Sequence, residues 1–136
     1  PPAALIQGLG RTPVSTLKGR HYVAVFDDPE EVAALEPKFD VLETLDLPTI
    51  AVTARGNESD YVLRFFAPAN GVPEDPVSGV AQCSLMPYWA SKLARAELTS
   101  RQLSPKGGEM NCKMLDEGVQ IAGPCCTIFS GVLENC

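Results

Sequence analysis

The longest apolar segment of the chain begins at Gly79 and predicts a buried helix. Polar Lys92 and Arg95 come only near its end, and its apolar residues cover nearly every helical face: Val80, Ala81, Cys83, Leu85, Met86, Tyr88, Trp89, Ala90, Leu93 and Ala94. A helix with this pattern is normally buried on all sides, so Met86, Tyr88 and Trp89 are interpreted as core residues. Pro87, inside the segment, is expected to kink the helix or to leave a carbonyl group unpaired.

Runs of β-branched and aromatic residues precede and follow this helix. The runs at residues 49–54 and 61–66 flank a turn-forming segment, Arg55-Gly56-Asn57-Glu58-Ser59-Asp60, and predict a hairpin. Further strands are predicted at residues 22–26, 98–104, 109–115, 119–122 and 125–133. Since strands lie on both sides of the helix in sequence, we expect a curled sheet wrapped around it.

Two short helices are predicted in the first part of the chain. Residues 3–9 end at Gly10, a residue that commonly terminates helices. Asp28-Pro29-Glu30-Glu31 combines a capping acid, a proline in the first helical position and acids in the first turn, so a surface helix is expected from there to Leu35.

The length and composition agree with one folded domain over residues 1–136. This length is ample for a single hydrophobic core, and 45% of the residues are hydrophobic. The predicted fold class is α+β, with a mainly antiparallel curled sheet or barrel around a central buried helix.

Candidate chemistry lies in the loop of residues 67–78, which joins a predicted strand to the helix. It contains three prolines, an Asn-Gly pair and the adjacent acids Glu74 and Asp75, and it ends at Ser78, the expected helix cap. The first helical turn leaves backbone N–H groups free, so it could hold a carboxylate or phosphate, with Asp75 as a general acid or base. The alternative is that Asp75 and Ser78 only cap a core helix.

The net charge of the chain disfavours two classes of partner, nucleic acids and anionic membranes. The chain has a formal charge of −6, a pI near 4.7 and no cluster of basic residues, which disfavours binding to nucleic acid or to an anionic membrane. No apolar run is long enough to span a membrane, and no signal peptide is recognisable. A small-molecule substrate and a cytoplasmic location are therefore expected.

The cysteines and the single histidine give no metal-binding pattern. Five cysteines, two of them adjacent at Cys125 and Cys126, are interpreted as reduced thiols, and Cys83 as a small core residue. His21 follows Lys18-Gly19-Arg20 and is expected at the surface or at a sheet edge. No metal and no cofactor are predicted.

Five ordered motifs resemble the PhzF-like phenazine-biosynthesis family. They are R-F-F-A-P at residues 64–68, G-V-P-E-D-P-V-S-G-V-A at 71–81, P-Y-W at 87–89, Q-L-S-P-K-G-G at 102–108 and G-V-L at 131–133. The resemblance implies a diaminopimelate-epimerase-like fold. It also implies a relation to proteins of about twice this length, with two similar domains and the active site between them, of which this chain resembles the C-terminal half.

The resemblance assigns roles to four residues. Asp75 is the expected catalytic acid or base, and the segment Ser78, Gly79 and Val80 is expected to bind the substrate carboxylate. Val80 replaces a serine of the family pattern, which removes a hydroxyl donor and keeps the backbone N–H. Lys106 replaces an arginine, which keeps the charge and loses a planar donor pair. The proton-shuttling glutamate and a partner histidine are expected from the missing N-terminal half.

Three functions remain open from the sequence. The first is a cofactor-independent isomerase that moves a proton on a small carboxylated substrate. The second is a non-catalytic domain that binds small molecules, and the third is a half-domain that only pairs with a partner. The expected partner is a second copy of the chain, in a homodimer, or a separate N-terminal half.

Overall fold

Residues 1–132, the part of the chain that the computed structural model describes, contain both helices and strands. The class is α+β, as predicted. The elements are α1 (Ala3–Leu9), β1 (Ser15–Lys18), β2 (Tyr22–Val25), α2 (Pro29–Ala33), α3 (Phe39–Leu42), β3 (Ile50–Arg55), β4 (Tyr61–Ala67), the 3₁₀ turn η1 (Pro68–Asn70), β5 (Val72–Glu74), α4 (Gly79–Leu93), β6 (Glu97–Gln102), β7 (Gly108–Leu115) and β8 (Gly118–Ala122).

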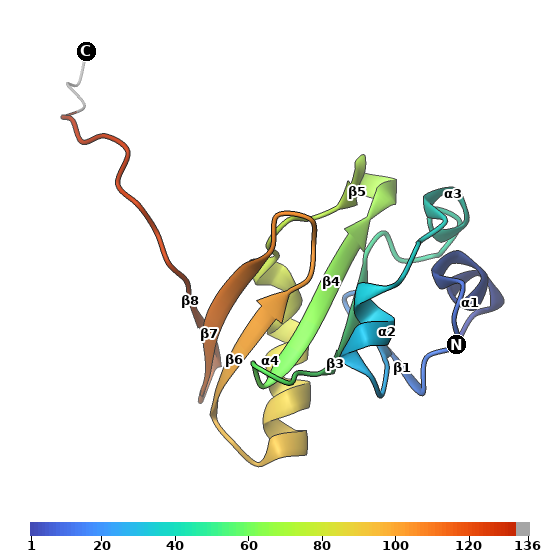
Figure 1. Cartoon of the computed structure of the whole chain (residues 1–136), viewed down its shortest axis with the longest axis horizontal. Coiled ribbons are helices and arrows are strands. Elements are labelled where there is room, and N and C mark those ends of the chain that lie inside the picture. Colours follow the sequence, from blue (N-terminus) through green and yellow to red (C-terminus); the bar gives the residue numbers. More distant parts are fainter. Residues whose placement is uncertain (133–136) are drawn as a thin grey trace.

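The strands form one mixed sheet in the order β1-β2-β3-β4-β6-β7-β8, with β5 paired to β4. Pairs β2–β3 and β4–β6 are parallel, and the other pairs are antiparallel. Within the described residues, β1 and β8 lie at opposite ends of the strand order and do not pair with each other, so of the predicted curled sheet or barrel the barrel is wrong. The sheet is open and twisted (Figure 1).

The last predicted strand is also absent from the described chain. Residues 125–132 contain no regular structure and run away from β8 (Figure 1). The side chains of Ile128 and Phe129 are 92% and 86% exposed. This stretch pairs with no strand of the sheet, and without such packing its β-favouring residues do not form a strand. Residue 133, the end of that prediction, lies outside the described residues.

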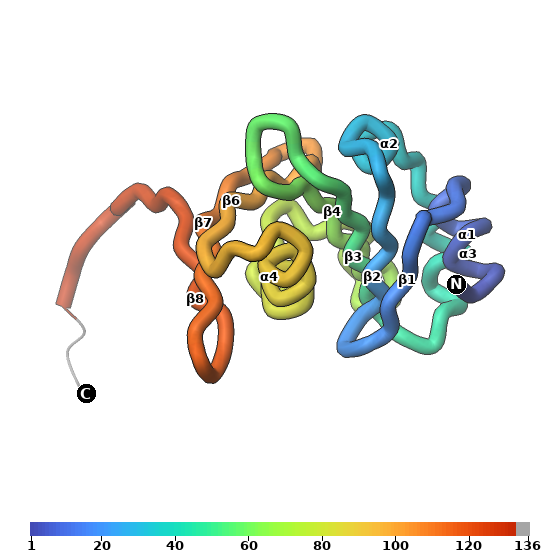
Figure 2. Tube along the Cα trace, turned by 90° about the horizontal axis from the view of Figure 1, so that it is seen from below, coloured from blue at the N-terminus to red at the C-terminus, as the bar shows by residue number. Residues whose placement is uncertain are grey.

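Two hydrophobic cores lie on opposite faces of the sheet. One packs α4 against β2, β4, β6 and β7 through residues such as Leu63, Phe65, Leu85 and Met86. The other packs α1, α2 and α3 against β2, β3 and β4. Figure 2 shows α4 on one side of the strands and α1 and α3 gathered near β1.

Helix α4 is covered on one face only, which corrects the prediction of burial on all sides. The residues Ala81, Gln82, Leu85, Met86 and Trp89 face the sheet and are buried. Cys83 and Pro87 are exposed, and Val80 is 38% exposed. An open sheet covers one side of a helix, so the apolar residues of the far side lie in solvent. The helix continues through Pro87 to Leu93, and the Cys83 carbonyl that this residue cannot bond lies at the exposed side.

Local signals predicted several element boundaries correctly. The Asp28 carboxylate accepts a hydrogen bond from the Glu30 N–H at 2.9 Å and caps α2, which ends at Ala33 and is two residues shorter than expected. Strands β3 and β4 form the predicted hairpin, with Ile50 opposite Phe66. Strands β1 and β5 and helix α3 were not predicted, because β1 is mostly polar and exposed and the other two are only three and four residues long.

His21 is buried, not at the surface as the sequence suggested. It is 2% exposed, and its ring lies edge-on to Phe65 with centroids 5.3 Å apart. Its Nε2 lies 3.0 Å from the Ser84 Oγ on α4, and its Nδ1 lies 3.3 Å from the Thr49 Oγ1. Burial lowers the pKa of His21 below its ordinary value, and the nearby Arg20 charge acts in the same direction.

This burial predicts a pH-dependent stability. Because the pKa of His21 is lower in the folded chain than in the unfolded one, the stabilisation is full above pH 6.5 and is lost as the pH falls through the folded value. His21→Gln should flatten the dependence of unfolding free energy on pH as the pH falls below about 7, where the slope for one proton is at most about 1.4 kcal/mol per pH unit.

Urea denaturation at several pH values measures this slope. His21 is the only histidine of the chain, so few other groups titrate in this range. Ser84→Ala, which removes a hydroxyl partner and keeps the imidazole, is the matched control and should keep the slope. Equal slopes for the parent chain and His21→Gln would contradict the assignment.

Candidate functional site

The N-terminus of α4 presents two unpaired backbone donors. Ser78 caps the helix in an extended conformation (φ −104°, ψ 106°), and its Oγ accepts a hydrogen bond from the Ala81 N–H at 3.4 Å. Among the described residues, the N–H groups of Gly79 and Val80 have no acceptor. Two adjacent free amides at the positive end of a helix of 15 residues favour an anion.

Space for a ligand lies beside these amides. A Cβ built on Gly79 would have no atom within 4 Å. Gly79 also borders a shallow hollow of about 530 Å³, lined by Val77, Gly79, Gly107, Gly108, Glu109, Met110, Ile121, Gly123 and Pro124. The lining is mostly glycine and apolar side chains, so it would suit the carbon skeleton of a small acid.

The segment from Asp75 to Ser78 is held in place by the end of β6 and the turn after it. Gln102 accepts a hydrogen bond from the Ser78 N–H at 2.7 Å and donates one to the Asp75 carbonyl at 2.5 Å. Ser104 donates to the Pro76 carbonyl at 2.6 Å. The sequence contained this signal, because both residues belong to the Q-L-S motif, but their role could not be assigned without the structure.

Asp75 lies just after β5 with its carboxylate available. Its N–H donates to the Phe65 carbonyl at 2.9 Å, which fixes the backbone, and the side chain is partly exposed. In residues 1–132 no hydrogen bond to this carboxylate is formed. The neighbouring acid, Glu74, is instead engaged by Arg64, with N···O distances of 2.8 and 2.9 Å. Asp75 is therefore the acid of this pair that remains free for chemistry.

The predicted binding residues differ in what they can offer. Ser78 is 1% exposed, its N–H is bonded to Gln102 and its hydroxyl oxygen caps the helix. The amides of Gly79 and Val80 remain free, so these two residues provide the donors of the candidate site. Lys106 lies in the exposed turn between β6 and β7.

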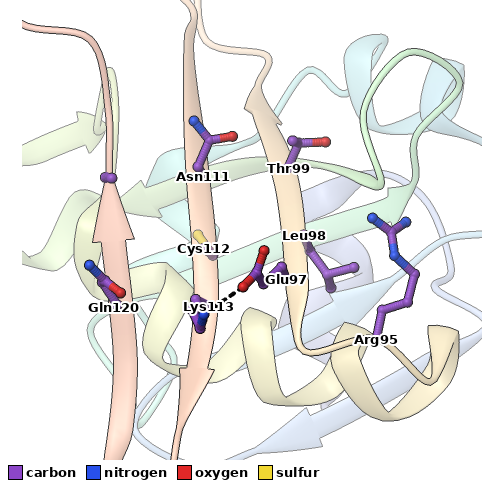
Figure 3. Close-up of a pocket in the computed structure, with 9 residues that line it drawn as sticks. Arg95, Glu97, Leu98, Thr99, Asn111, Cys112, Lys113 and Gln120 are labelled. Atoms are coloured by element: carbon purple, nitrogen blue, oxygen red, sulfur yellow. Dashed lines mark ion pairs between the residues drawn. The ribbon is translucent and has the colours of Figure 1, made fainter.

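A second hollow, of about 430 Å³, lies on the outer face of β6, β7 and β8 (Figure 3). Its polar groups include Glu97, Thr99, Asn111, Lys113 and Gln120. The Glu97 and Lys113 side chains form an ion pair at 2.6 Å, and Arg95 pairs with Asp60. The charged side chains of this surface are therefore paired with opposite charges, whereas the α4 terminus presents free donors.

Residues 1–132 contain neither a metal-binding cluster nor a membrane-spanning helix. No three His, Cys, Asp or Glu side chains lie close enough together to hold a metal ion. Among the described helices, none has the length and apolar character needed to cross a membrane. Cys83, Cys112, Cys125 and Cys126 are free thiols, and burial raises the pKa of Cys112.

Comparison with known proteins identifies the family. Residues 6–131 match the family profile described as phenazine biosynthesis-like protein, PhzC-PhzF. The chain belongs to this family. It is 47% identical over 128 residues to an uncharacterized isomerase of Pseudomonas aeruginosa, covering 93% of this chain and 49% of that protein. A second uncharacterized isomerase of the same organism is 40% identical over 133 residues, with coverage of 98% and 51%.

Solved structures of the family have the same architecture. A PhzF-family protein of Enterococcus faecalis superposes with a TM-score of 0.87 at 36% identity, covering 90% of this chain and 48% of that one. A PhzC/PhzF protein of Clostridium difficile gives 0.87 at 30% identity, with coverage of 98% and 52%. The chain therefore spans about half the length of the relatives it matches. The relation to diaminopimelate epimerase, implied by the sequence motifs, stays a prediction.

Proposed function

We propose that this PhzF-family chain is the carboxylate-binding half of a cofactor-independent isomerase. The free amides of Gly79 and Val80 carry the proposal, because they offer an anion two donors at a helix N-terminus, four residues after the unpaired acid Asp75. The chain would correspond to the C-terminal half of its relatives, and the other half would supply the principal base.

The proposed reaction moves one proton and needs no redox partner. A base removes a proton from a carbon near the substrate carboxylate, the electron pair spreads into the unsaturated carboxylate system, and a proton is returned at another carbon. Backbone amides at the carboxylate stabilise the charge that develops there. Asp75 would act as the acid or base that exchanges a proton with the substrate on this side.

A non-catalytic binding role is the weaker candidate. The same amides would serve it, but both Pseudomonas aeruginosa relatives are named isomerases. Asp75 separates the two functions, because proton transfer would need its carboxylate whereas binding through the amides would not. A cytoplasmic location and the exclusion of nucleic acid remain predictions from composition.

Removing one amide donor tests the site. Gly79→Pro deletes the N–H at the first helical position, where proline is well tolerated, and the extended Ser78 before it suits a following proline. We expect affinity for a small carboxylate such as benzoate to fall by about tenfold or more, since a hydrogen bond to a charged group contributes about 1.5–3 kcal/mol.

Gly79→Ala is the matched control. It adds a Cβ in the same place, where no atom lies within 4 Å, and it keeps the N–H. Titration followed by amide chemical shifts should show the largest changes at Gly79 and Val80 in the parent chain, and none with neutral benzamide. Shifts confined to other residues, or equal affinities for the two variants, would reject the site.

Catalysis by the isolated chain should be negligible. The loss of a principal general acid or base costs about a hundredfold to ten-thousandfold in rate, and here that group would reside on the missing half. Turnover of a cyclohexadiene carboxylate can be followed by ultraviolet absorbance. Rates equal to those of a full-length relative, abolished by Asp75→Asn, would show instead that this half is self-sufficient.

Self-association is expected for the chain on its own. The outer face of α4 is exposed, Val77 and Val80 are 40% and 38% exposed, and the edges β1 and β8 are unpaired in the described residues. Exposed apolar surface and open edges favour association. Light scattering should detect a homodimer at about 100 μM, a concentration at which an interface with a micromolar Kd is occupied. A monomer at that concentration would instead favour pairing with a separate half.

A further inference from the structure

We propose that the end of β6 and the turn after it position the α4 terminus, with Gln102, the last residue of β6, as the main positioning residue. Together they would set the conformation of residues 75–78 and thereby the direction of the free amides of Gly79 and Val80. The effect on carboxylate binding rests on the proposed function, whereas the control of the conformation of residues 75–78 does not.

Gln102 bonds both ends of the segment of residues 75–78, called the loop from here on, with one side chain. It is 2% exposed, its Oε1 accepts from the Ser78 N–H and its Nε2 donates to the Asp75 carbonyl. These partners define the orientation of the amide, because a flipped side chain would face a donor with a donor and an acceptor with an acceptor. Glutamine therefore does here what a neighbouring strand would do for an extended segment.

Ser104 holds the middle of the same loop. Its hydroxyl donates to the Pro76 carbonyl at 2.6 Å and accepts from the Gly107 N–H at 3.1 Å. The side chain is nearly buried, at 8% exposure. A single hydroxyl thus links the backbone of the turn to the backbone of the loop.

Gly108 allows the turn and the loop to pack closely. A Cβ at this position would lie 2.5 Å from Val77 Cγ2, closer than real Cβ atoms approach, and 3.3 Å from Val77 Cγ1, which is a tight contact. Gly107, just before it, adopts a left-handed conformation with φ of 67°, which other residues rarely adopt. Glycine is therefore favoured at position 108 by the close packing and at position 107 by the left-handed backbone.

These contacts leave the loop little freedom. Asp75, Pro76 and Ser78 are bonded to Gln102 or Ser104, and Val77 packs against Gly108 at the start of β7. The dihedral angles of the Ser78 cap set where the first turn of α4 begins. A change at Gln102 should consequently move the amides while the helix and the sheet remain folded.

Amide hydrogen exchange in the 136-residue chain tests this directly. Gln102→Met keeps the side-chain length and removes both hydrogen bonds. The exchange of the Ser78 N–H, normalised to global unfolding, should accelerate by about tenfold or more, since the amide loses its acceptor. The chemical shifts of Gly79 and Val80 should change, and benzoate affinity should fall by about threefold to tenfold.

Ser100→Ala is the matched control. Ser100 is also buried, lies two residues earlier on the same strand and bonds Gln82 of α4 rather than the loop. It should lower stability without accelerating normalised exchange at Ser78. Equal normalised effects of Ser100→Ala and Gln102→Met would overturn the inference and leave Gln102 with a purely structural role.

A third variant tests the same inference should Gln102→Met fail to fold. Ser104→Ala removes one bond to the loop and should shift the Val77 and Ser78 amides; unchanged shifts there would count against the inference. If exchange at Ser78 accelerates as expected but the parent chain binds no carboxylate, the positioning role stands and the proposed function fails. If carboxylates bind equally to all variants and Ser78 exchange is unaltered, the positioning role fails and the proposed function stands.

Discussion

The burial of β4 on both faces is the constraint on which the rest of the structure depends. Tyr61, Leu63 and Phe65 face α4, while Val62, Arg64 and Phe66 face the helices on the other side. A guanidinium in this position must be fully paired. Arg64 bonds both oxygens of Glu74, and its Nη1 donates to the Leu35 carbonyl at 2.7 Å beyond the end of α2. This pairing also fixes β5 beside β4.

The candidate site inherits its geometry from these bonds. With Glu74 tied to Arg64, Asp75 begins the loop at a fixed point on β4, and Gln102 fixes the loop's other end. Helix α4 is itself anchored by buried hydrogen bonds, among them Tyr61 to Gln82 at 2.5 Å and Trp89 to Thr53 at 2.9 Å. The amides of Gly79 and Val80 are therefore preorganised, which is the condition for electrostatic stabilisation of a developing charge.

Sequence reasoning succeeded where a signal was local. The caps Asp28 and Ser78 and the β3–β4 hairpin follow from residues a few positions apart, and the structure confirms all three. It failed where the outcome depended on distant partners. The burial of His21 requires α4 to lie over it, and the exposure of Cys83 requires the sheet to remain open. Neither condition can be inferred from the pattern around the residue itself.

Solvent exposure of the α4 terminus would weaken any site that this chain forms alone. The Val80 amide and the Asp75 carboxylate lie at a surface, where water competes for every hydrogen bond. Two unit charges at 4 Å interact by about 1 kcal/mol in water and by about 4 kcal/mol at an effective dielectric constant of 20. A second domain that covered the α4 terminus would exclude water and strengthen the existing contacts without moving them. The chain thus holds the amide donors of α4 in position, and a covering domain would strengthen their interaction with a bound anion.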